Sequence, residues 1–480
     1  MLLSALIGDA AGGGGPDAIS DARVTGFAID HRKVADGTIF GAFKGAKFNG
    51  EDFIADAVAA GAIAVVARPE AKVTGAHHIA SDNPRKTFAD IAARFFAPFP
   101  AHVAAVTGTN GKTSTVELSR QLWRMAGHNA ASIGTLGVTT AQDQVRTGLT
   151  SPDVVTFLAN MAGLSREGVS HAIFEASSHG LDQYRVAGVP VGVVAFTNLS
   201  RDHLDYHDDM DSYFEAKMRL FDEVASEAAT AVIWADDAWS EKAIARAKAR
   251  DLNLITVGEK ANGIRLVARK PTQLGQDLDI EVQGEHYKVK LPLIGAYQAA
   301  NALTACAIVI ASGESAESVI ANLSRLQTVR GRLERAAIAR SGTPVYVDYA
   351  HTPDGLDAAI KALRPHTKGR LIVLFGAGGD RDAGKRPLMG AIAQELADIA
   401  IITDDNPRSE DPAAIRAAIR AAAPDALEIG DRRNAIAEAI RLSQADDIVL
   451  VAGKGHEQGQ TIGDQTLPFD DVQVVRECMA

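Results

Sequence analysis

The stretch that decides the fold reads HVAAVTGTNGKT and covers residues 102–113. Its apolar half, His102–Val106, has the length of a buried strand, and the glycine-rich half opens a predicted helix. Backbone amides of such a loop point at phosphate, and the helix N-terminus adds partial positive charge. Lys112 can neutralise phosphate and Thr113 can bind Mg²⁺. The loop departs from the full Walker A pattern at Val106, where that pattern has glycine, and a chance glycine-rich turn is the minor alternative.

Short apolar runs recur along the chain, and each is followed by a small or polar residue and then by a helix-like pattern. Such alternation is typical of parallel sheets that are buried on both faces, so the predicted fold class is α/β. Residues 262–292 instead alternate apolar and polar side chains and predict a hairpin or meander. The runs after the first are Ala172–Phe174, Val191–Phe196, Ala231–Trp234, Val345–Val347, Leu371–Phe375, Ile399–Ile402 and Ile448–Val451.

The length of 480 residues gives room for about three domains of ordinary size. Residues 1–97 are predicted to form a small N-terminal α/β domain, which ends before Pro98 and Pro100. Residues 98–328 are predicted to form a central parallel-sheet ATPase domain that contains the phosphate-binding loop. Residues 329–480 start a fresh strand–helix series and predict a C-terminal Rossmann-like α/β domain.

Charge and cysteine content exclude several classes of protein. The 49 basic and 60 acidic residues give a net charge of −11, which disfavours nucleic acid as a partner. No apolar run reaches the ~18 residues of a membrane span, and residues 1–20 lack the basic start of a signal peptide. Cys306 and Cys478 match no zinc or CxxC spacing, so we expect ordinary thiols in a reduced, cytoplasmic protein.

Chemistry-bearing side chains follow two further predicted strands. Glu175 ends one of them and is a natural Mg²⁺ ligand beside a phosphate-binding loop. The segment FTNLSRDHLDYHDD, residues 196–209, contains His203 and His207. Their spacing is compatible with zinc, but the acidic surroundings favour a magnesium and phosphate site for His203 and a solvated loop position for His207. By composition alone, Lys217 is expected to be a surface lysine.

The last third of the chain carries four polar motifs, and each follows an apolar strand. They are VDYAHTPDG (347–355), FGAGGDRDAGKRPLMG (375–390), TDDNPRSEDP (403–412) and VAGKGHEQG (451–459). Arginines that converge with lysines and acidic residues suit a substrate that carries both carboxylates and an amine. The tetrapeptide DNPR also occurs at Asp82–Arg85, where it is expected only to cap a helix.

In this order and over nearly the whole chain, the motifs resemble those of the Mur ligases of bacterial peptidoglycan synthesis, especially those that add diaminopimelate. The segments GTNGKT, EASSHGL, TNLSRDHLDYH, DYAHTPD, GGDRDAGKRPLM, DNPR and GKGHE carry the resemblance. It implies an ATP- and Mg²⁺-dependent amide ligase that joins meso-diaminopimelate to UDP-N-acetylmuramoyl-L-alanyl-D-glutamate through an acyl phosphate. It also implies a cytoplasmic enzyme, which we expect to be a monomer.

The same resemblance assigns roles to individual residues of this chain. The ATP site would comprise Gly108, Thr109, Asn110, Gly111, Lys112, Thr113, Ser114, Asn301 and Arg332. The UDP-muramyl-dipeptide site would comprise Ile29, His31, Ala46, Lys47, Phe48, Thr150, Ser151, Ser177, Gln183 and Arg185. The diaminopimelate site would comprise Arg381, Asp405, Asn406, Pro407, Arg408, Gly453 and Glu457. The catalytic residues would be Lys112, Glu175, His203 and Lys217, and the magnesium ligands would be Thr113, Glu175, His203 and Lys217 as its carbamate.

Two departures and two rival functions accompany this interpretation. His31 stands where the family commonly has serine, and Gln298 where it commonly has asparagine, which bears on the uracil and adenine contacts.

Folylpolyglutamate synthase shares the chemistry of the phosphate-binding loop, but residues 25–50 and the second DNPR argue against that function. A nucleotide-binding regulator would have no use for GGDRD and GKGHE.

Selection of diaminopimelate is expected to depend on Arg408. We expect this arginine to be buried and to pair with the second carboxylate of diaminopimelate.

Overall fold

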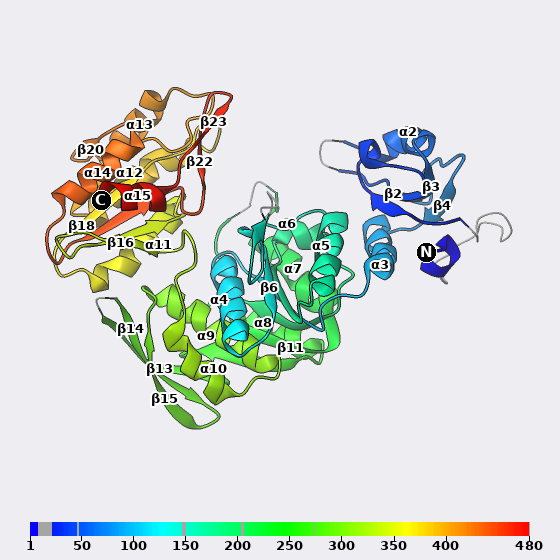
Figure 1. Ribbon diagram of the computed structural model, residues 1–480, viewed down its shortest axis with the longest axis horizontal. Coiled ribbons are helices and arrows are strands. Elements are labelled where there is room, and N and C mark those ends of the chain that lie inside the picture. The colour runs from blue at the N-terminus through cyan, green and yellow to red at the C-terminus, as the bar shows by residue number, and fades with distance from the viewer. Residues whose placement is uncertain (8–21, 46–47, 146–149, 203–205, 273, 480) are drawn as a thin grey trace. The chain divides into compact units, whose positions relative to one another are not determined.

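The computed structural model describes residues 1–7, 22–45, 48–145, 150–202, 206–272 and 274–479. The chain divides into two compact units, and each contains both helices and β-sheets (Figure 1). The first comprises Met1–Thr256 and Ala307–Glu314, and the second comprises Val257–Cys306 and Ser315–Ala480. Each strand predicted from an apolar run is present, so the predicted α/β class is confirmed. In the part of the chain described, no helix is long and apolar enough to cross a membrane.

The first unit opens with a parallel sheet in the order β1 (Gly26–Ala28), β2 (Thr38–Gly41), β3 (Ala62–Ala67) and β4 (His77–Ala80). Its helices are α1 (Leu3–Ile7), α2 (Ile54–Ala59) and α3 (Pro84–Phe96). The first DNPR segment starts α3, because the Asn83 side chain accepts a hydrogen bond from the Lys86 amide and Pro84 occupies the first turn. The predicted helix cap is confirmed.

A second sheet of this unit holds the phosphate-binding loop. This sheet has 11 strands, and those from β12 onward are, in spatial order, β12 (Asn253–Gly258), β11 (Ala225–Trp234), β10 (Val191–Phe196), β5 (His102–Thr107), β9 (His171–Glu175), β6 (Ala130–Gly134), β7 (Gly137–Thr139) and β8 (Gln144–Val145). The strands from β11 to β6 are parallel, so the carboxyl ends of β5, β9 and β10 lie along one edge of the sheet. The accompanying helices are α4 (Lys112–Met125), α5 (Val154–Arg166), α6 (Ser178–Asp182), α7 (Met210–Arg219) and α8 (Ser240–Ala249).

Three histidine rings stack at the opposite, amino-terminal ends of β5 and β9. The centroid of the buried His171 ring lies 4.4 Å from that of His102 and 4.0 Å from that of His128. The His128 Nε2 atom lies 2.7 Å from a carboxylate oxygen of Glu314. Burial, together with the charges of the other two histidines, lowers the pKa of His171 to about 4.

This stack predicts that the first unit loses stability in mild acid. The folded-state pKa of His171 lies below its unfolded value, so its contribution is complete above about pH 6.5 and is lost as the pH falls toward 4. At about pH 5 the free energy of unfolding should fall by about 2 kcal/mol from this group. We expect the thermal midpoint of the wild type to drop more between about pH 7.5 and about pH 5 than that of His171→Phe. Equal drops would contradict the assignment.

The second unit begins with an antiparallel meander of β13 (Ile264–Thr272), β14 (Gly275–Val282) and β15 (Glu285–Leu291). The meander predicted for residues 262–292 is therefore confirmed. Helices α9 (Ala296–Ala311) and α10 (Ala316–Asn322) follow it in sequence.

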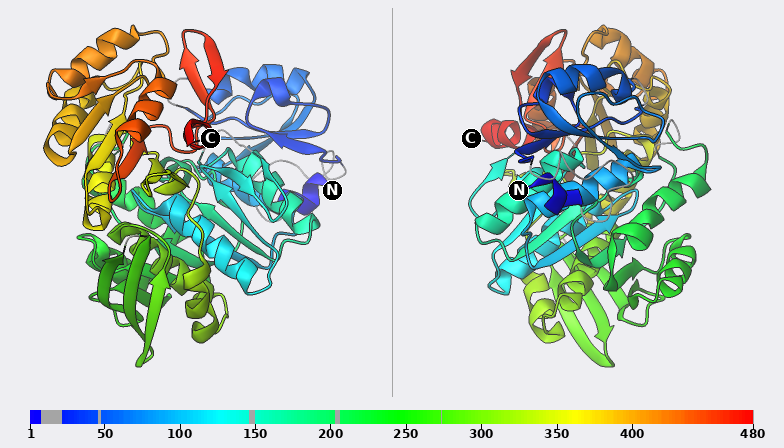
Figure 2. Two further views of the ribbon diagram at one scale, coloured as in Figure 1. Left: turned by 60° about the vertical axis from the view of Figure 1, so that its left-hand side comes forward. Right: turned by 90° about the vertical axis from the view of Figure 1, so that its right-hand side faces the viewer.

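The rest of this unit is a doubly wound sheet in the order β16 (Glu334–Ile338), β17 (Pro344–Asp348), β21 (Ile448–Ala452), β18 (Leu371–Phe375), β19 (Ile399–Ile402) and β20 (Leu427–Glu428). All neighbouring strands are parallel except β16 and β17. Alternate strand residues pack against α11 (Pro353–Leu363), α12 (Lys385–Leu396) and α13 (Pro412–Arg420) on one face. The others pack against α14 (Arg432–Leu442) and α15 (Asp471–Met479) on the other face (Figure 2). A hairpin of β22 (Gly459–Ile462) and β23 (Gln465–Pro468), which the sequence did not predict, follows β21.

Candidate functional site

The glycine-rich loop between β5 and α4 has the backbone that phosphate binding requires. Gly108 has φ of +145°, and a Cβ atom there would collide with the Thr197 hydroxyl. Gly111 has φ of +83° and occupies the N-cap position of α4. Asn198 fixes the loop from the end of β10, because it accepts hydrogen bonds from the amides of Asn110 (2.9 Å, side chain) and Thr109 (2.9 Å, carbonyl). Strand end and helix start are thus held together at one edge of the sheet.

Two lysines converge on the carbonyl oxygen of Gly108. Lys112 Nζ donates to it at 2.7 Å, and Lys217 Nζ donates to it at 2.9 Å. Lys217 is 1% exposed and lies 4.3 Å from the centre of the Tyr213 ring. The surface position expected for Lys217 from composition is therefore wrong. Burial, and then the charge of Lys112, lowers the pKa of Lys217 well below its ordinary value, which favours a neutral amine beside the loop.

Oxygen ligands suited to Mg²⁺ lie beside the same loop. The Thr113 hydroxyl donates to one carboxylate oxygen of the buried Glu175 at 3.0 Å, and the Thr135 amide donates to the other at 2.7 Å. Magnesium prefers such oxygen ligands and retains several waters. Across the described ranges, no three His, Cys, Asp or Glu side chains form a group that could hold a metal ion. His203, the third predicted ligand, lies outside those ranges.

The solvated position expected for His207 is wrong. His207 is buried, and its ring centroid lies 4.9 Å from that of Tyr206 and 5.1 Å from that of Tyr213. Tyr213 is a buried residue of α7, so His207, which reads as part of a polar loop, packs among aromatic rings.

The structure brings together most residues predicted to contact the muramyl dipeptide. The hydroxyls of Ser151 and Ser177 are 3.0 Å apart. Arg185 donates to the Ser151 carbonyl at 3.3 Å and to the Gln183 side chain at 2.8 Å. The Thr150 hydroxyl lies 3.1 Å from that of Thr135, the residue whose amide binds Glu175. This group therefore lies beside the predicted magnesium ligands.

The residues predicted to contact UDP lie in the N-terminal sheet region of the same unit. The His31 ring stacks on Phe53 with centroids 4.4 Å apart, and the side chain of Phe48 is 74% exposed. Ile29 is also exposed, whereas Ala46 and Lys47 lie outside the described residues. An exposed aromatic ring and a stacked imidazole are compatible with binding a flat base.

Arg85, in the first turn of α3, also contacts residues 43 and 44. Its guanidinium lies 4.9 Å from the centre of the Phe43 ring and donates to the Lys44 carbonyl at 3.1 Å. Burial, and then the charge of Arg185, lowers its pKa. The expectation that this DNPR copy only caps a helix is therefore wrong for Arg85. The pattern gave no sign of this role, since it depends on contacts between distant segments.

In the second unit, Gln298 links the two residues predicted to contact ATP there. Its side-chain oxygen accepts from Asn301 at 3.3 Å, and its side-chain nitrogen donates to the Arg332 carbonyl at 3.0 Å. The Arg332 guanidinium lies 4.7 Å from the centre of the Tyr349 ring. Gln298 is buried, so at this departure from the family pattern an amide still joins α9 to the segment before β16.

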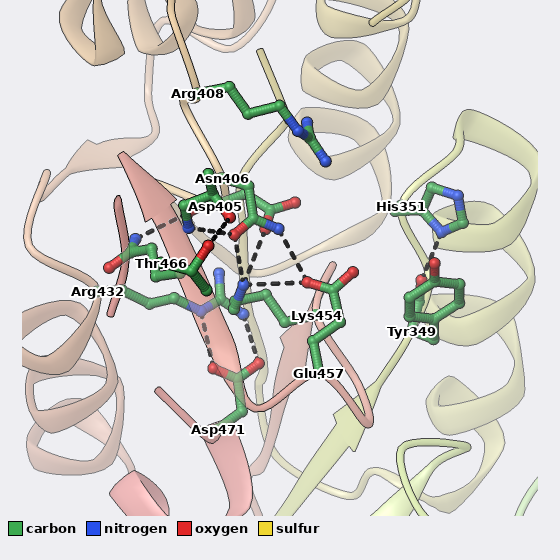
Figure 3. Close-up of polar contacts among 12 residues, drawn as sticks. Tyr349, His351, Asp405, Asn406, Arg408, Arg432, Lys454, Glu457, Thr466 and Asp471 are labelled. Carbon is green, nitrogen blue, oxygen red and sulfur yellow. Dashed lines mark hydrogen bonds and ion pairs between the residues drawn. The ribbon is translucent and has the colours of Figure 1, made fainter. Parts of the chain in front are cut away.

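The residues predicted to bind diaminopimelate follow β18, β19 and β21 of the doubly wound sheet. Asp405 and Asn406 are buried, as are Pro407 and Gly453. Arg408 is only half-buried, so its expected burial is wrong, and it donates to the Gly379 carbonyl at 2.7 Å. Figure 3 shows the Arg408 side chain directed away from Asp405, Asn406 and Lys454, and the residue remains partly exposed. Arg381 is exposed, and a Cβ atom at Gly378 would lie 2.9 Å from Arg408 Nη1 and 3.8 Å from Arg381 Cγ.

Lys454 is the residue of this region that sequence reasoning did not assign. It is 0% exposed, and its ammonium donates to Asn406 Oδ1 at 3.0 Å and to Glu457 Oε2 at 3.1 Å (Figure 3). Asp405 Oδ1 lies 3.5 Å away. Its position in GKGHE, between the predicted site residues Gly453 and Glu457, could have indicated a role in the site. Lysine side chains are ordinarily exposed, however, so burial of Lys454 was not expected.

Comparison with known families gives three matches along the chain. Residues 23–95 match the model described as Mur ligase family, catalytic domain; residues 106–309 match the Mur ligase middle domain; residues 331–455 match the Mur ligase, glutamate ligase domain. The UDP-N-acetylmuramoyl-L-alanyl-D-glutamate–2,6-diaminopimelate ligase of Zymomonas mobilis is 59% identical over 96% of this chain and 95% of its own. The ligase of that name from Bradyrhizobium diazoefficiens is 50% identical over 96% of each chain.

Solved structures agree with these matches. A structure of a UDP-N-acetylmuramoyl-L-alanyl-D-glutamate–2,6-diaminopimelate ligase is 32% identical, has a TM-score of 0.76, and covers 100% of this chain and 98% of its own. Folylpolyglutamate synthase of Mycobacterium tuberculosis, complexed with ADP, has a TM-score of 0.63 at 21% identity and covers 77% of this chain and 91% of its own, which shows a shared fold alone. The resemblance found in the motifs is thus confirmed, and the chain belongs to the Mur ligase family.

Proposed function

We propose that this protein is an ATP-dependent ligase that adds meso-diaminopimelate to UDP-N-acetylmuramoyl-L-alanyl-D-glutamate during peptidoglycan precursor synthesis. The observation that carries the proposal is 59% identity over 96% of the chain with a ligase of that name. Lys112 of the phosphate-binding loop, the buried Lys217 beside it and the charged cluster of the second unit support the proposal, because a phosphoryl donor and a zwitterionic amino acid each need such groups.

In this proposal, three sections of the chain each bind a different substrate. Residues 1–97 bind the UDP-muramyl end, residues 98–328 bind ATP, and residues 329–480 bind the amino acid. Separate sheets in these sections support the division, as do family matches over residues 23–95, 106–309 and 331–455. All proposed site residues lie on one chain, so a monomer suffices, and the need for ATP supports a cytoplasmic location.

In the proposed reaction, a D-glutamyl carboxylate attacks the terminal phosphorus of ATP, which gives an acyl phosphate and ADP. The amine of diaminopimelate then attacks the acyl carbon, and the tetrahedral intermediate expels phosphate as the amide forms. Phosphoryl transfer requires positioning and charge neutralisation more than covalent help. Lys112 and the loop amides supply both for the nucleotide, and Ser151, Ser177, Gln183 and Arg185 position the acceptor.

Thr113, Glu175, His203 and a carbamate on Lys217 would hold Mg²⁺, which would supply additional positive charge at the phosphates. The carbamate forms when a neutral lysine amine attacks carbon dioxide and loses a proton. The burial that lowers the pKa of Lys217 supports this modification, because it raises the fraction of neutral amine.

An amino-acid panel tests the proposal. ADP release is measured with ATP, Mg²⁺ and UDP-muramyl dipeptide in the presence of meso-diaminopimelate, L-lysine or L-glutamate. We expect ADP release that depends on both the dipeptide and meso-diaminopimelate. Release with a folate acceptor and L-glutamate would favour folylpolyglutamate synthase, and release that needs no amino acid would favour a nucleotide switch.

A further inference from the structure

Lys454 lies at the centre of the proposed amino-acid site, but solvent does not reach it. Its side chain is 0% exposed, and its ammonium faces Asn406, Glu457 and the Asp405 carboxylate. A buried ammonium is costly unless acceptors surround it, so its three neighbours also fix its position. Because it is enclosed, Lys454 is placed to act on the substrate only through these neighbours.

Asn406 connects three separate segments through its side-chain amide. Its Oδ1 atom accepts from Lys454 Nζ at 3.0 Å and from the Thr461 backbone amide at 2.9 Å. Both of these groups can only donate, so they determine which end of the amide is oxygen. Its Nδ2 atom then donates to Glu457 Oε2 at 2.9 Å. The DNPR loop, the GKGHE loop and the β22–β23 hairpin therefore meet at one side chain.

The same hairpin holds the backbone of the DNPR loop. Gln460 Nε2 donates to the Asp405 carbonyl at 2.7 Å. The Arg408 amide donates to the Thr461 carbonyl at 3.0 Å, and the Gly463 amide donates to the Arg408 carbonyl at 2.7 Å. These bonds keep Arg408 at φ of +52°, a left-handed conformation that a residue other than glycine adopts only when its surroundings enforce it.

We propose that Lys454 is a positioning residue for amino-acid selection, acting through Asn406 and Glu457, and that the β22–β23 hairpin is the second support of the same site. Without the ammonium, the carboxylates of Asp405 and Glu457 lose their nearest counter-charge and keep that of Arg432, whose guanidinium already pairs with Asp471. Asn406 also loses one of its two fixed donors. Glu457 and the loop that carries Arg408 then leave the orientation that receives the amine and carboxylate groups of the amino acid. This inference rests on the proposed function and deepens it.

Lys454→Met tests the role, because methionine keeps the unbranched chain and most of its length but removes the charge. We expect the KM for meso-diaminopimelate to rise about tenfold or more, since hydrogen bonds to charged groups are lost. The KM values for ATP and UDP-muramyl dipeptide should stay within about twofold of the wild type. The matched control is Lys368→Met at an exposed lysine of the same unit, which should leave all three unchanged. An unchanged KM for diaminopimelate, or an equal rise in all three, overturns the proposal.

Gln460→Ala decides the question if the methionine variant does not fold. Gln460 is only half-buried on the hairpin, and its removal deletes one bond to the Asp405 carbonyl. We expect a rise of about threefold to tenfold in the KM for meso-diaminopimelate alone, with an unchanged thermal midpoint. Wild-type kinetics in this variant would overturn the supporting role of the hairpin. A wild-type enzyme that does not use diaminopimelate at all would instead refute the proposed function.

Discussion

Replacement of Lys217 by alanine is expected to lower turnover by about a thousandfold or more. The side chain is buried beside the phosphate-binding loop, and burial favours the neutral amine from which a carbamate forms. Loss of that carbamate would remove a magnesium ligand and the charge neutralisation that phosphoryl transfer requires. Steady-state ADP release measures the loss, and added acetate or formate should restore part of the rate by replacing the missing anion.

Lys248→Ala is the matched control, because Lys248 is an exposed lysine on α8 of the same unit. It should retain the wild-type rate and should not respond to added carboxylates. Near-normal turnover in Lys217→Ala would refute the catalytic role. A slow variant that does not respond to any short carboxylate would contradict the carbamate specifically.

Replacement of Arg408 by alanine is expected to remove most of the activity with meso-diaminopimelate and most of the selectivity against L-lysine. L-Lysine lacks the second carboxylate, which the guanidinium is proposed to bind with two parallel hydrogen bonds. Arg408 is half-buried and already donates to the Gly379 carbonyl, so an unpaired guanidinium costs less than in a closed pocket. We therefore expect wild-type discrimination of about a hundredfold or more in kcat/KM, and about tenfold or less in the variant.

Arg420→Ala serves as the control, because Arg420 is an exposed arginine on α13 that pairs with Glu428. It should change neither the rate nor the selectivity. Undiminished preference for diaminopimelate in Arg408→Ala would show that another group binds the second carboxylate. Equal use of both amino acids by the wild type would refute the specificity while leaving the ligase chemistry intact.

Most of the fold could be predicted from the sequence because buried parallel strands are short, apolar and followed by polar residues. His102–Val106 and Leu371–Phe375 show this clearly, and the structure places strands over both. The β22–β23 hairpin was missed because its strands are only four residues each and carry mainly polar side chains. Its role depends on bonds to the distant DNPR loop, which no local pattern reports.

Burial of charged residues was the other failure of prediction. Lys217 was expected at the surface and Lys454 was assigned no role, yet both are buried, and each donates to an acceptor far away in the sequence, Gly108 and Asn406 respectively. His207 lies among acidic residues in the sequence but packs among tyrosine rings. These positions result from tertiary contacts, whereas the loop at Gly108 could be recognised because its strand, glycines and helix start are adjacent in sequence.

One isotope measurement tests the central claim, ligation of diaminopimelate through an acyl phosphate. UDP-muramyl dipeptide is labelled with ¹⁸O in its glutamyl carboxylates and incubated with the enzyme, ATP, Mg²⁺ and meso-diaminopimelate. The account predicts a product heavier by one diaminopimelate residue, and one ¹⁸O atom transferred to each inorganic phosphate released. Phosphate without the label, or labelled phosphate without the amide product, would contradict it.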